Sequence, residues 1–399
     1  MHNARRMTIR AVAVALSLIV STAAFAQATD PLRSLSGTTV HPGVTSPWVQ
    51  SGDEGWTFFH AFDAHLTYSS QTGPEEQENE VFSTNWFAAG AHLPIGDRAF
   101  FLARGRVSLE PYTLPDNGYP QLLQYRSEQT GEVVLDRMRP QDLFGEAAVQ
   151  FGYRPSDASL LSIYAGLVGQ PALGPAPAQL RPSGVDFAEA PFAYDIQEAN
   201  HTKTSVITAG FATRLIQLEV SAFHDAITTG DHTELESGGI DSQSARLTLT
   251  PTPSVAIQVS RGELGEDLAQ RTINSASLTW GRPAVALTAL WTQRQYEADR
   301  VDEHAWGLEL ALRPGRNTFM VRVEHVDRPA GFPRELSTED VEEATHYTAG
   351  YLYDIVRGPR YRTGLGVNVD YRTKTHDIED LYGHKPQSIF AFVRVRTGM

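Results

Sequence analysis

Cysteine is absent from the 399 residues of the chain, so no disulfide bond contributes to the fold. An exported protein of this size without disulfides relies on a large apolar core or on a closed sheet. The sequence also lacks any stretch that approaches the roughly 18 uninterrupted apolar residues of a membrane-spanning helix. If the protein resides in a membrane, it therefore crosses the bilayer as β-strands.

Clustered metal ligands are missing as well. The histidines lie singly, and no short-spaced pair or His-Glu-x-x-His element occurs. His325 and His346 fall on neighbouring expected strands and could approach each other, but no cysteine or nearby third ligand accompanies them. We therefore expect no metal site and no cofactor, with the histidines as ordinary strand and loop residues.

A recognisable catalytic arrangement is the third absence. No Gly-x-Ser-x-Gly element is present. Ser205 follows His201 closely, and His224 precedes Asp225, yet these pairs define no nucleophile and base. The sequence thus predicts that the protein is not an enzyme, with a hydrolase at the rim of a barrel, using His201 or Ser205, as the less favoured alternative.

The N-terminus indicates the cellular compartment of the protein, and the net charge limits its possible partners. Arg5, Arg6 and Arg10 precede an apolar run and the small residues that end at Ala26, which is typical of a secretory signal peptide over residues 1–26. The formal charge is -14, and removal of those three arginines leaves about -17. Such an acidic chain is not expected to bind nucleic acid.

The spacing of turn signals indicates the architecture. Residues 27–54 show little periodicity and are expected to form an irregular periplasmic lead-in, and the barrel is expected over residues 55–399. From there, tight and long connections alternate. The tight connections are 94–97, 154–157, 214–217, 251–254, 281–284, 313–316 and 357–360. Short periplasmic turns and long external loops are typical of an outer-membrane β-barrel.

Sixteen segments between these connections carry the alternation of a sheet, in which successive side chains face opposite sides. They are 56–68, 81–93, 98–110, 143–154, 158–169, 203–214, 217–226, 242–251, 254–263, 271–281, 284–296, 304–313, 317–327, 345–357, 360–373 and 387–397. A soluble sandwich has the same period, so the even strand count and the alternating connection lengths decide the prediction. We predict an all-β, transmembrane, antiparallel up-and-down barrel of about 16 strands.

Aromatic and charged residues are sorted between the two kinds of connection. Aromatic side chains beside tight turns are Tyr153, Trp280 and Tyr361, and those near the opposite strand ends are Tyr68, Trp291, Tyr296 and Tyr371. Arginines such as Arg313 flank the tight turns, whereas carboxylates such as Glu75 and Glu339 occupy the long connections. We expect the aromatic residues to form interface girdles and the charges to meet outer-membrane lipid and lipopolysaccharide.

Charged side chains on the expected strands should face the lumen, because they are costly toward lipid. Together with two carboxylates of the long 170–202 connection, they are the candidates for a pore wall or constriction: Arg104, Arg106, Glu146, Asp186, Glu189, Arg322, Glu324, Arg362, Asp370, Arg394 and Arg396. A salt-bridge ladder filling a closed lumen is the structural alternative. The wall arginines and the acidic loops predict opposite ion preferences.

The connection 170–202 is the expected constriction. A loop of this length in a compact architecture is usually functional or disordered. Folded inward, its carboxylates Asp186, Glu189, Asp195 and Glu198 would face wall arginines such as Arg104, Arg106 and Arg394. Folded outward, it would be a surface loop without influence on selectivity. The sequence leaves both arrangements open.

Five segments in the loops and turns carry a resemblance: GYPQLLQ at 118–124, LDRMRPQDLFGE at 135–146, GQPALGP at 169–175, RPSG at 181–184 and LTPTPS at 249–254. Through them the mature chain resembles an uncharacterised, porin-like family of Gram-negative outer-membrane β-barrel proteins. The resemblance implies a barrel but little biochemistry. Relatives carry histidines where this chain has Arg139, Gln141 and 178–180, so a metal-handling role is not carried over.

These observations favour an outer-membrane channel, similar to porins, for passive diffusion of small hydrophilic solutes or ions. A closed structural or receptor barrel, or an accessory of metal resistance, is the alternative. The expected partners are outer-membrane lipid, lipopolysaccharide, the barrel-assembly machinery and small solutes. The sequence predicts no oligomeric state.

Overall fold

A computed structural model describes most of the chain after residue 33. The described residues are 34, 36–40, 42, 48–51, 55–72, 79–115, 118–127, 133–138, 140–197, 203–225, 232–235, 238–265, 270–297, 302–328, 342–374 and 386–397. The expected signal peptide, residues 1–26, lies outside them and stays a prediction. Among the described residues no helix is long and apolar enough to span a membrane.

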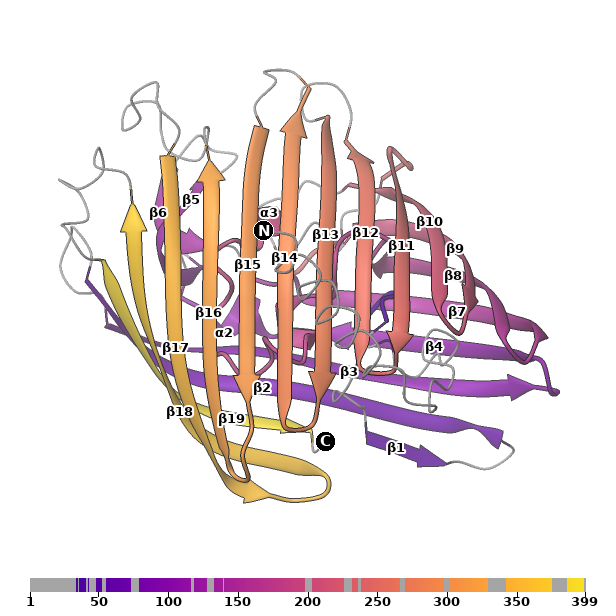
Figure 1. Cartoon of the computed structure of the whole chain (residues 1–399), viewed down its shortest axis with the longest axis horizontal. Helices are drawn as coiled ribbons and strands as arrows, with labels where there is room; N and C mark the ends of the chain where they lie inside the picture. The colour runs from indigo at the N-terminus through magenta and orange to yellow at the C-terminus, as the bar shows by residue number, and fades with distance from the viewer. Residues whose placement is uncertain are drawn as a thin grey trace, which may run out of the picture.

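Sixteen antiparallel strands form the wall (Figure 1). They are β2 (Thr57–Gln71), β3 (Asn79–Ile95), β4 (Ala99–Val107), β7 (Phe144–Ser156), β8 (Ser159–Gly169), β9 (Lys203–Thr213), β10 (Ile216–His224), β11 (Ser242–Thr252), β12 (Val255–Leu264), β13 (Arg271–Arg282), β14 (Val285–Tyr296), β15 (Asp302–Leu312), β16 (Asn317–Arg328), β17 (Glu342–Arg357), β18 (Tyr361–Lys374) and β19 (Gln387–Thr397). Each pairs with the next, and β19 pairs with β2, so the sheet closes into a barrel.

The predicted strands and tight turns are confirmed. Each of the sixteen expected segments overlaps one wall strand, and bounds differ by at most a few residues, as where β4 ends at Val107 instead of residue 110. All seven expected tight connections join neighbouring strands. The fold class read from the alternation of connection lengths is therefore correct.

The wall is apolar outside and polar inside. Along β19, Ile389 and Val393 are exposed on the outer face, whereas Phe390, Arg394 and Arg396 are buried on the inner face. An outward apolar band with an inward polar face is the pattern that a bilayer imposes on a barrel, because lipid cannot solvate charge. The alternation thus fixes which charges enter the lumen.

Most of the predicted girdle residues lie on the outer face. Tyr153 and Tyr361 are exposed near tight turns, and Tyr68, Trp291 and Tyr371 are exposed toward the other end; Trp280 is half-buried. The prediction for Tyr296 is wrong. It shares the inward face of β14 with Arg294, whose guanidinium carbon lies 5.4 Å from the Tyr296 ring centroid. A cation over the ring explains an aromatic residue on the polar face.

The N-terminal segment, by which we mean the described residues between 34 and 42, does not stay outside the barrel. Ser36, Thr39 and Val40 are buried, and Val40 packs with wall residues Phe59 and Phe100. The short strand β1 (Trp48–Ser51) pairs with the start of β2. Part of the expected periplasmic lead-in therefore enters the barrel. Inward apolar side chains of the wall give it a packing surface that the sequence pattern does not reveal.

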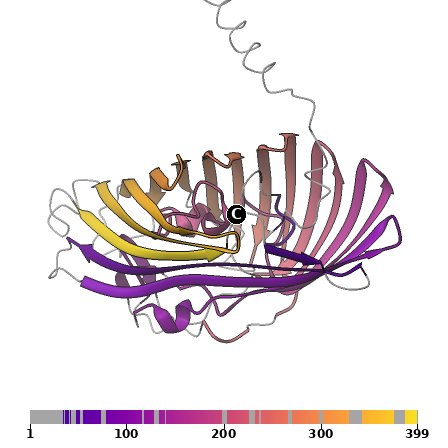
Figure 2. The same ribbon diagram turned by 90° about the horizontal axis from the view of Figure 1, so that it is seen from below.

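Further elements lie within the long connections. α2 (Glu110–Thr113) follows β4, and β5 (Tyr119–Ser127) pairs with β6 (Val133–Met138) as a separate two-stranded sheet. η3 (Ala178–Leu180) and α3 (Tyr194–Gln197) belong to the connection after β8. Figure 2, seen from below, shows α2 outside the ring of strands, whereas other segments of the long connections lie inside it. They place loop side chains against the inward charges of the wall.

Candidate functional site

The inserted loop, residues 170–197, lies inside the barrel, which answers the question that the sequence left open for its described part. Almost all of its residues are buried. Its first turn is fixed by two wall serines, since Ala172 N donates to Ser221 Oγ at 2.8 Å and Gly174 N donates to Ser260 Oγ at 2.8 Å. Phe187 then packs among the inward wall side chains Ala311, Met320, Leu352 and Phe392.

Asp186 binds three arginines of the wall. Arg313 Nε donates to Asp186 Oδ2 at 2.8 Å, Arg396 Nη1 lies 2.9 Å from Oδ1, and Arg394 Nη1 also contacts Oδ1. Burial alone would raise the pKa of the Asp186 carboxyl, but the guanidinium groups of Arg396, Arg313 and Arg394 hold it well below its usual range. Arg313, which we expected at the lipid-facing rim, instead turns inward because this carboxylate compensates its charge.

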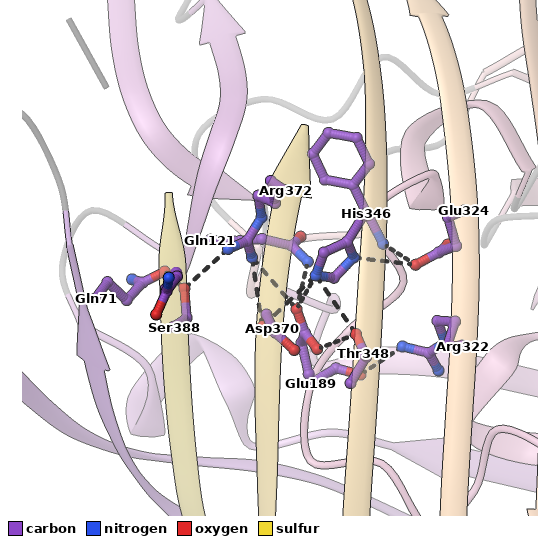
Figure 3. Close-up of polar contacts among 12 residues, drawn as sticks. Gln71, Gln121, Glu189, Arg322, Glu324, His346, Thr348, Asp370, Arg372 and Ser388 are labelled. Atoms are coloured by element: carbon purple, nitrogen blue, oxygen red, sulfur yellow. Dashed lines mark hydrogen bonds and ion pairs between the residues drawn. The ribbon is translucent and has the colours of Figure 1, made fainter. Parts of the chain in front are cut away.

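Glu189 forms a second junction with the wall (Figure 3). Its Oε1 lies 3.2 Å from His346 Nε2 and 3.4 Å from Arg372 Nη2, and its Oε2 accepts a hydrogen bond from Thr348 Oγ1 at 3.0 Å. Asp370 Oδ2 lies 3.6 Å from His346 Nε2. Burial would raise the pKa of the Glu189 carboxyl, but His346 and then Arg372 hold it well below its usual range.

A third junction involves residues that the sequence did not single out. Arg181, in the inserted loop, binds Glu309 of β15 with two contacts, Nη2 to Oε1 at 2.8 Å and Nε to Oε2 at 3.2 Å. Arg322 Nε lies 3.3 Å from the same Oε1, and Ser183 Oγ donates to Oε2 at 2.8 Å. A bidentate arginine pair fixes orientation as well as charge. The loop thus supplies both an arginine and carboxylates to its ion pairs with the wall.

Arg104 pairs with Glu146 and not with a carboxylate of the inserted loop, which we expected to face it if the loop folded inward. Arg104 Nε lies 2.8 Å from Glu146 Oε2 and Nη2 lies 2.8 Å from Oε1, and the pair receives the N-terminal segment. Gly37 N donates to Glu146 Oε1 at 2.9 Å, and Arg104 Nη2 donates to Gly37 O at 2.6 Å. Tyr164 donates to the same carboxylate at 2.8 Å.

The remaining candidates take varied positions. Glu324 accepts hydrogen bonds from the backbone N–H groups of Phe192 and Ala193, at 2.8 and 3.2 Å. Arg106 donates to Gly145 O at 3.2 Å and approaches no loop carboxylate among the contacts of the described residues. Arg362 is only half-buried. Glu198 lies outside the described residues, as does the side chain of Asp195.

Buried charge in the described part of the chain is nearly balanced when His346 is left aside. Twelve buried cations are Arg104, Arg106, Arg137, Arg181, Lys203, Arg246, Arg294, Arg313, Arg322, Arg372, Arg394 and Arg396. Twelve buried anions are Asp63, Glu110, Glu146, Asp186, Glu189, Glu219, Asp225, Glu303, Glu309, Glu324, Asp354 and Asp370. Equal numbers at short range leave little net field along the lumen.

A cavity of about 70 Å³ lies beside the inserted loop, between α2, β2 and the β5–β6 hairpin. Asp63, Glu110, Tyr119 and Glu189 line it. Burial raises the pKa of the Glu110 carboxyl to about 7, although Gln141 donates two hydrogen bonds to it. The volume accommodates several water molecules, since one needs only about 10–15 Å³ on this measure.

Those residues of the alternative hydrolase that the structure describes are not assembled as a nucleophile and base. Ser205 Oγ donates to the carbonyl of Gly238 at 3.2 Å. His224 Nδ1 contacts Asp241, and not Asp225, whose carboxylate lies 2.7 Å from Arg271 Nη1. His201 lies outside the described residues. The described part of the chain therefore gives the hydrolase no geometric support.

No family model matches the sequence, and no curated protein matches it either. Solved structures of porins and outer-membrane channels do resemble its fold. OmpF of Salmonella typhi in complex with daunomycin gives a TM-score of 0.56 at 10% identity, covering 88% of this chain and 100% of that one. An anion-selective porin from Comamonas acidovorans gives 0.52 at 11%, covering 86% and 99%. The outer-membrane channel DcaP of Acinetobacter baumannii gives 0.53 at 8%, covering 87% and 99%.

Proposed function

We propose that the protein is a passive diffusion channel of the outer membrane for small hydrophilic solutes or ions. The 16-stranded porin fold is the premise, since a barrel of this size leaves room for an aqueous lumen beside its loops. The observation that carries the proposal is the inserted loop, held against the wall by Asp186 and Glu189. A loop fixed within a charged barrel narrows the lumen without adding catalytic groups.

The chemistry of the lumen supports hydrophilic solutes. Charged side chains, including Arg104, Arg322 and Asp370, face inward from many strands, and the cavity beside the inserted loop carries Asp63 and Glu110. A surface with this many hydrogen-bonding groups replaces part of the hydration of a polar solute, whereas an apolar solute would have to displace ordered water. Passage, and not reaction, is therefore the function we propose.

Reconstitution into planar lipid bilayers tests the proposal. Folded barrel should give discrete conductance steps in potassium chloride, and an Asp186→Asn variant should give larger steps, because it loosens the inserted loop. The exposed turn variant Asp157→Asn is the matched control and should conduct like the original protein. Silent bilayers with correctly folded, inserted protein would refute the channel.

A closed structural or receptor barrel is the second candidate, and a specific observation favours it. The N-terminal segment and the inserted loop are both buried within the barrel, and the cavity beside the inserted loop is small. Such a barrel would show no conductance in bilayers, and the buried ion pairs would still stabilise its fold. The same conductance experiment separates the two candidates.

The partners of the proposed channel are outer-membrane lipid and lipopolysaccharide on the exposed apolar face, and the small solutes in the lumen. We also propose that the barrel-assembly machinery inserts the chain after a signal peptide over residues 1–26 directs export. Pulse labelling of the precursor and of a variant with Arg5 and Arg6 replaced would test the export step, since the variant should accumulate uncleaved.

A further inference from the structure

We propose that Glu189, His346 and Asp370 form a binding site for one divalent transition-metal ion, with Zn²⁺ as its probe. One ligand atom from each of these residues lies within 4.8 Å of the other two. The inference goes beyond the channel proposal, because it concerns how the inserted loop is fixed and not what passes it. It also departs from our expectation of no metal site, which rested on the absence of a short-spaced pair of histidines and of a third ligand near His346 in the sequence.

Distances within the cluster suit an ion. His346 Nε2 lies 3.2 Å from Glu189 Oε1 and 3.6 Å from Asp370 Oδ2. Zinc bonds to nitrogen and oxygen of about 2.0–2.2 Å place neighbouring ligand atoms roughly 3.0–3.6 Å apart in octahedral or tetrahedral geometry. The three side chains therefore need only small shifts to surround a metal, and Figure 3 shows them converging from the loop, β17 and β18.

The cluster is buried and contains an unused ligand atom. His346 and Asp370 are 0% exposed, and Asp370 Oδ1 has no hydrogen-bond partner within the described structure. A buried carboxylate oxygen without a partner costs free energy, which a coordinated cation would recover. Glu189 also borders the cavity beside the inserted loop, so an ion could reach it from water there.

A carboxylate also lies near the second ring nitrogen of His346, the position of the outer carboxylate in many metal-binding histidines. Glu324 Oε2 lies 3.5 Å from His346 Nδ1, on the side of the ring away from Glu189. Nδ1 has no hydrogen-bond partner within the described structure, and a slightly closer Glu324 would hold the proton there while Nε2 faces Glu189, Asp370 and Thr348. Glu324 is itself fixed by the N–H groups of Phe192 and Ala193. Thr348 similarly orients Glu189 through its hydrogen bond to Oε2.

Arg372 is the competitor of the ion. Its Nη2 lies 3.4 Å from Glu189 Oε1 and 3.5 Å from Asp370 Oδ2, and Ser388 accepts from its Nη1 at 2.9 Å. Without a metal, this guanidinium and a protonated His346 can balance the two carboxylates. A bound metal takes the place of the imidazole proton and is repelled by Arg372. Removing the guanidinium should therefore strengthen metal binding.

The ligand set selects the class of ion. One imidazole with two carboxylates suits divalent first-row transition metals such as zinc, cobalt or manganese. Calcium takes six to eight oxygen ligands and gains little from an imidazole. We therefore expect Zn²⁺ to bind and Ca²⁺ not to compete. The ion would join the inserted loop to β17 and β18 in a single cross-link.

Calorimetric titration of the full-length, chelator-treated barrel with zinc chloride tests the site. We expect one Zn²⁺ per barrel, with binding lost in His346→Gln and weakened about 10- to 100-fold in Glu324→Gln. His325→Gln is the matched control. His325 lies on the neighbouring strand, where its Nδ1 shares a hydrogen bond with Thr345 Oγ1 outside this cluster. Absence of Zn²⁺ binding, or equal affinity in His346→Gln, would overturn the assignment.

Arg372→Gln supplies a result that misfolding cannot imitate. We expect its Zn²⁺ affinity to rise roughly tenfold, the scale of outer-shell effects on metal sites. Unchanged or weaker affinity in this variant would contradict the competition on which the site rests. Heat-dependent mobility in gels verifies that each variant is folded. None of these measurements uses conductance, so failure of the metal site and failure of the proposed channel remain distinguishable.

Discussion

Arg313, at the tight turn after β15, donates from its Nε to Oδ2 of Asp186 at 2.8 Å, although 127 residues separate the two in sequence. The inserted loop leaves the wall at the long-connection end of β8, and this contact brings it to the tight-turn end of the lumen. The carboxylate compensates an arginine that would otherwise be buried without a counter-ion. The pair therefore defines how far the loop enters the barrel.

Asp186→Asn should destabilise the barrel. The change leaves Arg313, Arg394 and Arg396 buried without their shared carboxylate, and breaking a buried ion pair on one side costs about 3–5 kcal/mol. The free energy of unfolding, measured by denaturant titration in lipid vesicles, should fall by that order. The exposed control Asp157→Asn should change it little, and an equal loss in both variants would contradict the structural role of Asp186.

Arg104→Gln should release the N-terminal segment from the wall. Its guanidinium holds the Gly37 carbonyl and positions Glu146, which accepts from Gly37 N. Hydrogen–deuterium exchange of a peptide containing Gly37 should become faster in this variant. Arg261→Gln removes a guanidinium that is 59% exposed and should leave the exchange unchanged. Slow exchange in both variants would show that Arg104 does not anchor the segment.

Stability should fall between about pH 4.5 and pH 7 through Glu110. Its pKa is 4.5 when exposed and about 7 in the fold, so the native state binds the proton more tightly. The stability that Glu110 contributes is fully present below its unfolded pKa and is lost as pH rises through its folded pKa. The free energy of unfolding changes by roughly 3 kcal/mol. Glu110→Gln should remove this slope from unfolding free energies measured across the range. A slope that persists in the variant must come from another group.

Ion selectivity of the channel should be weak. Twelve buried cations and twelve buried anions in the described part of the chain cancel at short range. Reversal potentials in a potassium chloride gradient should lie near zero. Glu309→Gln should shift them toward anions, because it leaves Arg181 and Arg322 uncompensated. A strong preference in the original protein would contradict the balance of lumen charges.

The wall was predictable because lipid imposes a simple rule on it. Each strand must alternate apolar and polar side chains and end near the membrane interface, so short-range patterns locate the sixteen wall strands within a few residues. The rule fails inside the barrel, where apolar and polar faces are both buried. The β5–β6 hairpin and the buried position of Val40 therefore left no periodic signal.

The sequence indicated which charged residues face the lumen, but not which residues they contact. Inward charges such as Arg394 and Asp370 follow from the alternation of their strands. Their contacts depend on loop residues far away in sequence, and so Arg394 meets Asp186 whereas Arg104 meets Glu146. His346 illustrates the limit most clearly. The expected neighbour His325 is paired with Thr345, while Glu189 of the inserted loop reaches His346 instead.

Single-channel recording of the folded protein in planar bilayers tests the proposed function most directly. The account predicts stepwise conductance in the original protein and larger steps in Asp186→Asn, with Asp157→Asn unchanged. Bilayers that stay silent although gel mobility shows folded barrel, in both the original protein and Asp186→Asn, would contradict the channel and favour the closed barrel.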